Sequence, residues 1–105
     1  MTGIDETTYD RGFAVRVVST PDTSTLLLSG EFDSHVADEL RDVLEKALAT
    51  STTVVLDVEG VTFIDSSALN VLLAARRHET PYRVTRGNRV VDRLFELTGL
   101  TFMYD

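Results

Sequence analysis

Two short polar segments carry the side chains in this sequence that are best placed for chemistry. In the first, Asp65, Ser66 and Ser67 follow the strand-like residues 61–64 and precede an apolar stretch with helical spacing. Hydroxyls at the start of a helix lie where backbone N–H groups lack intrahelical partners and where the helix dipole is positive. A phosphate on Ser67 would add roughly -1.5 to -2 charges, which a helix N-terminus tolerates. The segment is therefore a candidate for reversible phosphorylation.

The second polar segment, residues 30–34, lies between an apolar run and the first helical pattern and ends in Asp33 and Ser34. Ligands and partners of α/β sheets tend to meet the loops beyond the carboxyl ends of the strands. If the strands before the two segments are parallel neighbours, Asp33 and Ser67 come to the same edge of the sheet. A simpler interpretation is that Asp65 or Ser66 only caps a helix. Capping and modification are compatible, because three polar residues exceed what one cap needs.

The first half of the chain predicts a hairpin followed by a helix and a buried strand. Residues 13–18 alternate with a β-type period, and the turn residues 19–22 separate them from three leucines at 26–28. From Ser34 the period becomes helical, with Asp33 or Ser34 as N-cap candidates. The β-branched run at 54–58 predicts a parallel strand that is covered on both faces. Residues 1–11 carry almost no apolar pattern and predict a flexible tail.

The second half continues the alternation of strands and helices. Residues 61–64 lead directly into a helix with a leucine stripe, residues 82–86 predict a short strand, and residues 90–97 predict a third helix that Gly99 ends. Residues 102–104 are expected to close the sheet. The element order β-β-α-β-α-β-α-β predicts a single α/β domain over residues 12–105, with helices as crossovers in a mixed, mainly parallel sheet.

Composition narrows the classes of function. The chain has 105 residues, no cysteine and a formal net charge of -7. That length predicts one domain, and that charge has the wrong sign for neutralising nucleic-acid phosphates, so we expect no direct DNA or RNA binding. The N-terminal residues do not resemble a secretory signal, and the longest apolar region, residues 68–75, is too short to span a bilayer. We therefore expect a cytoplasmic protein with no membrane association.

Few features support an enzyme. His35 and His78 are the available bases for a hydrolase triad with Ser67 and Asp33, but both lie in charged helix-end sequence, and the chain has no Gly-x-Ser-x-Gly elbow. No cluster of His, Asp or Glu has recognised metal-ligand spacing, and no Gly-rich loop is present to hold a nucleotide. We expect no catalytic residue, no metal site and no cofactor.

Three segments resemble the STAS domain of bacterial anti-sigma factor antagonists: residues 28–33 (LSGEFD), residues 56–69 (LDVEGVTFIDSSAL) and residues 94–100 (LFELTGL). The resemblance extends over nearly all of the chain from Phe13 onward, and residues 65–67 are its most specific part. Two positions depart from the family pattern: Ala68, where Gly is usual, and Phe32, where Leu is usual. Compared with Gly, Ala68 adds a methyl close to the surface that a partner would approach.

The resemblance implies a regulatory role for the STAS domain at residues 12–105. It places the family's phosphorylated residue on Ser67, although Ser66 lies beside it and the resemblance alone chooses between the two. In the family, an anti-sigma factor with serine kinase activity binds the unmodified antagonist and phosphorylates this serine with its own ATP, and a phosphatase reverses the step. The expected partner-binding residues are Asp33, Asp65, Ser66, Ser67 and Asn70. The expected function is therefore non-enzymatic, indirect regulation of transcription.

Two other functions fit the same fold. A STAS domain can also be an accessory subunit that binds the ATPase of a membrane transporter, or a component of a large stress-signalling scaffold. Either role needs the surface around Ser67 but not necessarily the phosphate. The identity of the bound partner would distinguish these functions from that of an antagonist.

Overall fold

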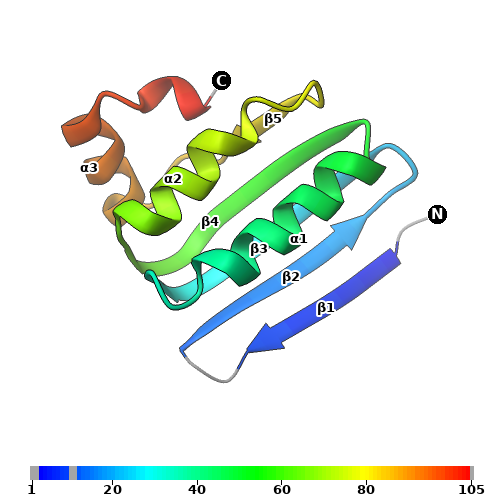
Figure 1. Ribbon diagram of the computed structural model, residues 1–105, viewed down its shortest axis with the longest axis horizontal. Coiled ribbons are helices and arrows are strands. Elements are labelled where there is room, and N and C mark those ends of the chain that lie inside the picture. The colour runs from blue at the N-terminus through cyan, green and yellow to red at the C-terminus, as the bar shows by residue number, and fades with distance from the viewer. Residues whose placement is uncertain (1–2, 10–11, 105) are drawn as a thin grey trace.

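The computed structural model describes residues 3–9, as backbone, and residues 12–104. The described residues form one five-stranded sheet, in which the strands follow their order in the chain (Figure 1). The strands are β1 (Gly3–Tyr9), β2 (Phe13–Ser19), β3 (Thr23–Phe32), β4 (Thr53–Ile64) and β5 (Tyr82–Val84). The helices are α1 (Ala37–Thr50), α2 (Ser66–Ala75), α3 (Arg89–Thr98) and the short 3₁₀ helix η1 (Thr101–Tyr104).

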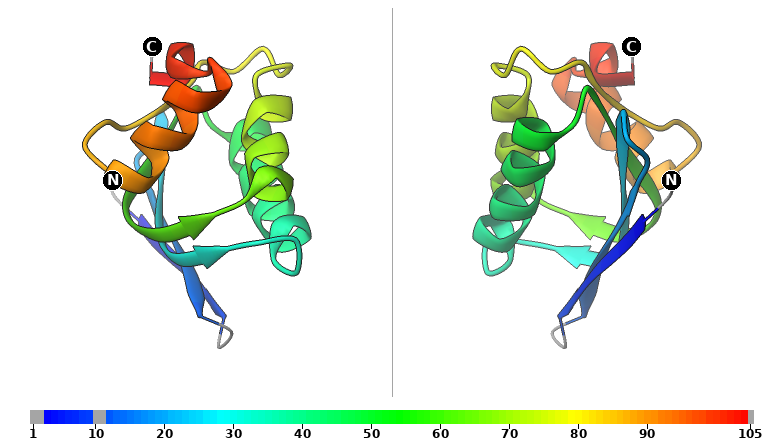
Figure 2. Two further views of the ribbon diagram at one scale, coloured as in Figure 1. Left: turned by 90° about the vertical axis from the view of Figure 1, so that its left-hand side faces the viewer. Right: turned by 90° about the vertical axis from the view of Figure 1, so that its right-hand side faces the viewer.

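The direction of each strand follows from its connection to the next one. Tight connections make β1, β2 and β3 antiparallel, whereas α1 and α2 serve as crossovers that make β3, β4 and β5 parallel. Figure 2 shows α1 and α2 on one face of the sheet and α3 on the other. The structure therefore confirms the predicted single α/β domain with a mixed sheet.

The structure differs from the prediction at both ends of the chain. Gly3–Tyr9 is strand β1, paired with β2 along its whole length, and not part of a flexible tail. This strand was not predicted because its residues show no continuous apolar face. Backbone hydrogen bonds to a neighbouring strand can hold an edge strand without one. Residues 1–2 and 10–11 of the predicted tail lie outside the described residues. Residues 102–104 belong to η1 and do not close the sheet, because three residues are too few for periodicity to separate a strand from a helical turn.

The core lies between the sheet and its helices. Alternate residues are buried over 24–28 in β3 and over 54–58 in β4, and α1 buries one stripe against them. The residues between them are only half-buried, so the prediction that residues 54–58 are covered on both faces is wrong. The largest fully buried side chains are Phe32, Phe95, Leu26, Leu40, Leu44, Leu56, Leu72 and Met103. Gly99 ends α3 with a left-handed φ of 73°, as predicted, and Leu100 then donates its N–H back to the Phe95 carbonyl.

A buried side chain, Asn88, fixes α3 to β4. Its amide nitrogen donates to the carbonyl oxygens of Val58 (2.7 Å), Glu59 (3.1 Å) and Val61 (2.8 Å). Its side-chain oxygen accepts from the N–H of Val91 (3.0 Å), which caps α3. β5 pairs with β4 only as far as Leu56, so Asn88 supplies donors where the neighbouring strand has ended.

Replacing Asn88 tests this anchoring role. Asn88→Ala leaves buried carbonyls without a donor and removes a helix cap, so we expect the free energy of unfolding to fall by about 2–4 kcal/mol in urea titrations. Asn88→Asp keeps the capping oxygen but turns a carboxylate toward the same carbonyls, so its loss should be at least as large. The exposed Asn70→Ala serves as control, with a change below about 0.5 kcal/mol. Wild-type stability in Asn88→Asp would show that the carbonyl contacts contribute nothing.

Candidate functional site

The two polar segments meet because β3 and β4 are parallel and end side by side. Phe32 pairs with Ile64 in the register, so Asp33 and Asp65 are the next residues beyond the two strands. The N–H of Asp65 still donates to the carbonyl of Phe32 (3.1 Å), which continues the pairing by one residue. The structure confirms that Asp33 and Ser67 come to the same edge of the sheet.

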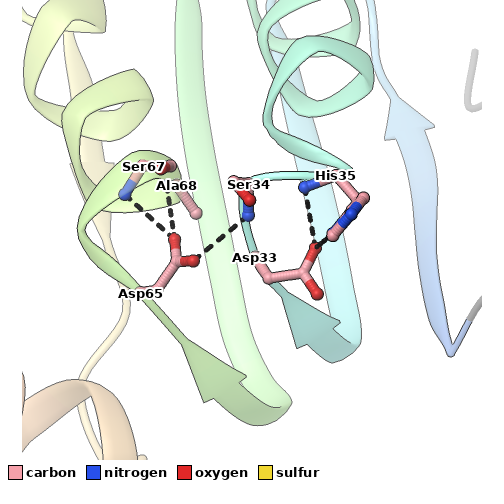
Figure 3. A network of polar contacts seen from close by, with 6 residues as sticks. All are labelled: Asp33, Ser34, His35, Asp65, Ser67 and Ala68. Atoms are coloured by element: carbon pink, nitrogen blue, oxygen red, sulfur yellow. Dashed lines mark hydrogen bonds and ion pairs between the residues drawn. The ribbon is translucent and has the colours of Figure 1, made fainter.

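The side chain of Asp65 joins the two loops at this edge (Figure 3). One carboxylate oxygen accepts from the N–H groups of Ser67 (2.9 Å) and Ala68 (3.1 Å), and the other accepts from the N–H of Ser34 (3.1 Å). Asp65 is therefore the N-cap of α2, as one of the two interpretations of this segment predicted. The helix start is less open to a phosphate than its sequence indicates, because Asp65 already occupies two of its amides.

Asp33 shapes the loop between β3 and α1 without capping the helix. Its carboxylate accepts from the N–H of His35 (2.9 Å), and the same oxygen lies 3.6 Å from the His35 ring nitrogen Nδ1 (Figure 3). The N-cap of α1 is Val36, which makes no side-chain capping bond, so the expectation that Asp33 or Ser34 caps this helix is wrong. The physical reason is a turn at residues 34–36, which lies between the end of β3 and the first helical residue, Ala37.

The end of β3 reaches this edge through a close backbone contact at Gly30. Gly30 has a φ of +90°, and a Cβ there would lie 2.0 Å from the carbonyl oxygen of Gly12. That oxygen accepts from the N–H of Glu31 (2.8 Å), and the β3–β4 register shifts between Gly30 and Glu31. Only glycine fits this position, so the LSGEFD pattern has a structural reason that is independent of any partner.

The predicted partner-binding residues differ in exposure and in place. Ser66 is exposed and Ser67 is half-buried in the first turn of α2, and Asn70 is exposed one turn further along the same helix. Within residues 12–104, neither serine hydroxyl makes a hydrogen bond, and no Lys or Arg forms a salt bridge with Asp33 or Asp65. The edge therefore presents two serine hydroxyls that make no hydrogen bond within the described residues, beside two carboxylates that accept hydrogen bonds from backbone N–H groups.

Both departures from the family pattern lie in the core. Phe32 is fully buried and packs edge-on against Phe13, with ring centroids 5.5 Å apart. Ala68 is also fully buried, so its methyl packs inward and does not reach the surface that a partner would approach. The expected effect of Ala68 on partner contact is therefore wrong, because the residue faces the interior of the domain.

Within residues 12–104, neither histidine forms a hydrogen bond with the Ser67 hydroxyl. His35 interacts with Asp33, but His78 follows the far end of α2, which is about 15 Å long. In residues 3–9 and 12–104, no group of three or more metal-binding side chains is placed to hold an ion. None of the helices in those residues has both the length and the apolar character that crossing a membrane requires.

A mixed sheet with two helices on one face and a third on the other, and a polar edge at the ends of β3 and β4, defines a small α/β domain of the STAS type. Residues 15–103 match the family model described as "Mlab, STAS domain". The match covers most of the chain, and the chain belongs to the STAS domain family.

Two curated bacterial proteins share part of the sequence. A STAS-domain containing protein of Pseudomonas aeruginosa is 37% identical over 54 residues, which are 51% of this chain and 54% of that protein. An anti-sigma F factor antagonist of Lysinibacillus sphaericus is 33% identical over 60 residues, 55% of this chain and 51% of that protein. The aligned part thus spans about half the length of each relative.

Solved structures share the fold over nearly the whole chain. An anti-sigma factor antagonist from Mycobacterium paratuberculosis superposes with a TM-score of 0.80 at 24% identity, over 93% of this chain and 87% of that one. The antagonist SpoIIAA in its unphosphorylated form gives 0.75 at 23% identity, over 88% and 86% of the two chains. Its phosphorylated form, from Bacillus, gives 0.69 at 22% identity, over 88% and 89%. At these identities the likeness establishes the fold alone.

Two substitutions at Asp65 separate its two structural contacts. Asp65→Ala removes the helix cap and the link to Ser34, so we expect the free energy of unfolding to fall by about 1–2 kcal/mol. Asp65→Asn keeps one oxygen for the amides of α2, but its NH₂ group cannot accept from Ser34. We therefore expect most of the stability to return while hydrogen exchange at the Ser34 amide stays fast, as measured by urea unfolding and NMR. A Ser34 amide that exchanges as slowly as in the wild type would contradict the proposed link.

Proposed function

We propose that this STAS domain is an anti-sigma factor antagonist. In this proposal, an anti-sigma factor with serine kinase activity binds the edge formed by Asp33, Asp65, Ser66, Ser67 and Asn70 while Ser67 is unmodified. Phosphorylation of Ser67 ends the binding, and a phosphatase restores it. The domain then regulates transcription indirectly, in the cytoplasm, and the ATP and the catalytic groups belong to the partner.

The observation that carries the proposal is the position of the Ser67 hydroxyl. Its backbone N–H is held by Asp65, so the residue has a fixed place where two loops meet, yet its side chain makes no hydrogen bond within the described residues. Because Asp65 supplies the cap, the fold does not need the hydroxyl. Ser67 is thus fixed in position and chemically available, which is the combination that a modified residue requires.

The same geometry explains how a phosphate would act on a partner. A phosphorylated serine carries roughly -1.5 to -2 charges, and the nearest helix amides are already bound to Asp65. The phosphate therefore either stays at the surface next to the two carboxylates or displaces Asp65 from the helix. In both cases the edge gains negative charge and changes its hydrogen-bonding groups. A penalty of about 3 kcal/mol would lower the affinity about a hundredfold.

The comparisons support the proposal at the level of the family. The Lysinibacillus relative is named as an antagonist of this kind, and SpoIIAA is known in unphosphorylated and phosphorylated forms that both superpose on this chain. A phosphate is thus compatible with a fold of this shape. That compatibility is consistent with a switch that alters the surface of the domain without unfolding it.

The test is affinity purification from the native cells with wild-type, Ser67→Ala and Ser67→Asp baits, followed by phosphopeptide analysis. We expect an anti-sigma kinase with the wild type and with Ser67→Ala, a loss of at least tenfold with Ser67→Asp, and phosphate on wild-type Ser67. Thr52→Asp is the matched control because it adds the same charge at an exposed hydroxyl residue just before the opposite end of β4, and it should recover the kinase as the wild type does.

Three results would contradict parts of this proposal. Equal recovery of the kinase by Ser67→Ala and Ser67→Asp would remove the switch while keeping the partner. Phosphate that persists in Ser67→Ala would assign the modification to Ser66. Recovery of a transporter ATPase or of a multi-subunit signalling scaffold, with no phosphate on either serine, would favour the accessory-subunit or scaffold function instead.

A further inference from the structure

An apolar hollow lies between the end of β4 and α3. Figure 2 shows that α3 covers the face of the sheet opposite α1 and α2. Its volume is about 440 Å³, and its apolar lining consists of Phe63, Ile64, Val90, Leu94 and Leu97. Three of these side chains are well exposed: Leu97 at 71%, Phe63 at 47% and Val90 at 39%. Contiguous exposed apolar surface of this kind marks interaction sites in soluble proteins.

The apolar residues of α3 form two stripes with different roles. Val91 and Phe95 are buried and attach the helix to the domain. Val90, Leu94 and Leu97 are spaced by four and then three residues along the other side, which is the spacing of a seam between two packed helices. This second stripe has no helix against it within residues 12–104. The sequence of α3 therefore suits a helix that packs on two sides.

Positive charge borders the same hollow. Arg89 and Arg93 both line it, one turn apart on α3, and both are exposed. Neither guanidinium forms a salt bridge with a residue of the described part of the chain. The chain as a whole carries a net charge of -7, so this basic border is a local exception. It favours a partner that brings negative charge to the edge of the hollow.

We propose that the hollow is a docking groove for an amphipathic α-helix of a protein partner, with an apolar stripe at helical spacing flanked by Asp or Glu. The stripe would pack on Leu94, Leu97 and Phe63, and the acidic residues would pair with Arg89 and Arg93. This is the helix-in-groove mode of recognition, in which apolar anchors at i, i+3, i+4 and i+7 enter a hydrophobic groove.

Charge and shape disfavour two other occupants. In a two-fold dimer built on this stripe, each residue near the axis faces its own copy, so a pairing centred on Leu94 would bring Arg93 close to the second Arg93. A helix that lies on a bilayer buries a whole apolar face, whereas α3 already uses Val91 and Phe95 in the core and exposes only the narrow stripe of Val90, Leu94 and Leu97. An acidic amphipathic helix fits both the narrow apolar stripe and the basic border formed by Arg89 and Arg93.

The groove and the edge that carries Ser67 adjoin at the end of β4, where Phe63 and Ile64 of the groove directly precede Asp65. α2 and α3 lie on opposite faces of the sheet, on either side of the end of β4 (Figures 1 and 2). The groove could hold a segment of the same partner or of a different one. Its existence does not depend on the antagonist function, and the test below uses no anti-sigma factor.

The experiment uses a synthetic amphipathic peptide of about 18 residues, long enough to form a helix, with leucines at the seam positions and glutamates beside them. A second peptide has lysine at each glutamate position. We expect the glutamate peptide to shift the amide NMR signals of Phe63, Val90 and Leu97, and to bind at least tenfold more tightly than the lysine peptide in fluorescence anisotropy. Added salt should reduce that difference.

Variants of exposed residues then locate the binding site without disturbing the fold. Leu97→Glu and Arg93→Glu should each weaken the glutamate peptide at least tenfold. The matched control is Leu73→Glu, because Leu73 is also an exposed leucine, at 37%, but belongs to α2 on the opposite face. It should bind the peptide as the wild type does, and unchanged amide spectra away from the substitution verify folding.

Several outcomes would overturn the proposal. Signal shifts confined to other surfaces, or equal affinity for the two peptides, would show that the groove does not recognise an acidic helix. A dimer in sedimentation experiments that Leu97→Glu abolishes would assign the groove to a second copy of the chain. Flotation of the protein with phosphatidylglycerol vesicles that Leu97→Glu abolishes would assign the surface to a bilayer.

Discussion

Parallel pairing between β3 and β4 determines where the functional groups of this domain lie. Because Phe32 pairs with Ile64, the chain leaves both strands at the same edge, and Asp65 reaches the backbone of Ser34, thirty-one residues earlier. That contact fixes the loop before α1 and the first turn of α2 relative to each other. Ser67 owes its place to this arrangement, since its N–H is bound to the same carboxylate. The strand register therefore brings these groups together whether or not a partner binds there.

A second constraint arises from the unequal lengths of β4 and β5, which have 12 and 3 residues. Beyond Leu56, β4 has no paired neighbour on the β5 side, and side chains replace the missing strand: Thr85 accepts from the N–H of Val58, and Asn88 donates to three carbonyls. Because Asn88 is also the N-cap of α3, its hydrogen bonds to β4 hold the start of α3 on the face opposite α1 and α2. The exposed stripe of α3 is a consequence of that placement.

Sequence patterns identified the features that depend on local periodicity. The alternation of β2, the strand at β4, the three α-helices and the Gly99 terminus were all predictable. That β3 and β4 are parallel neighbours was only a condition of the site prediction, and their register confirms it. The missed features depend on contacts between distant residues. β1 is held by pairing with β2, η1 is too short for a periodic pattern, and the link from Asp65 to Ser34 has no local signature. The core positions of Phe32 and Ala68 likewise follow from packing.

The division of roles between Asp65 and Ser67 bears on how a small domain can be switched. If a serine hydroxyl capped α2, phosphorylation would remove a structural hydrogen bond and add charge at once, and stability would change together with affinity. Here the carboxylate caps the helix, and neither serine hydroxyl is used within residues 12–104. A modification of Ser67 can then change the surface of the edge while the cap remains, unless the phosphate competes for the same two amides. The strength of the Asp65 cap therefore decides between two effects of a phosphate at Ser67. If the cap holds, the phosphate acts through its charge alone. If the phosphate displaces Asp65, it also releases the loop that contains Ser34.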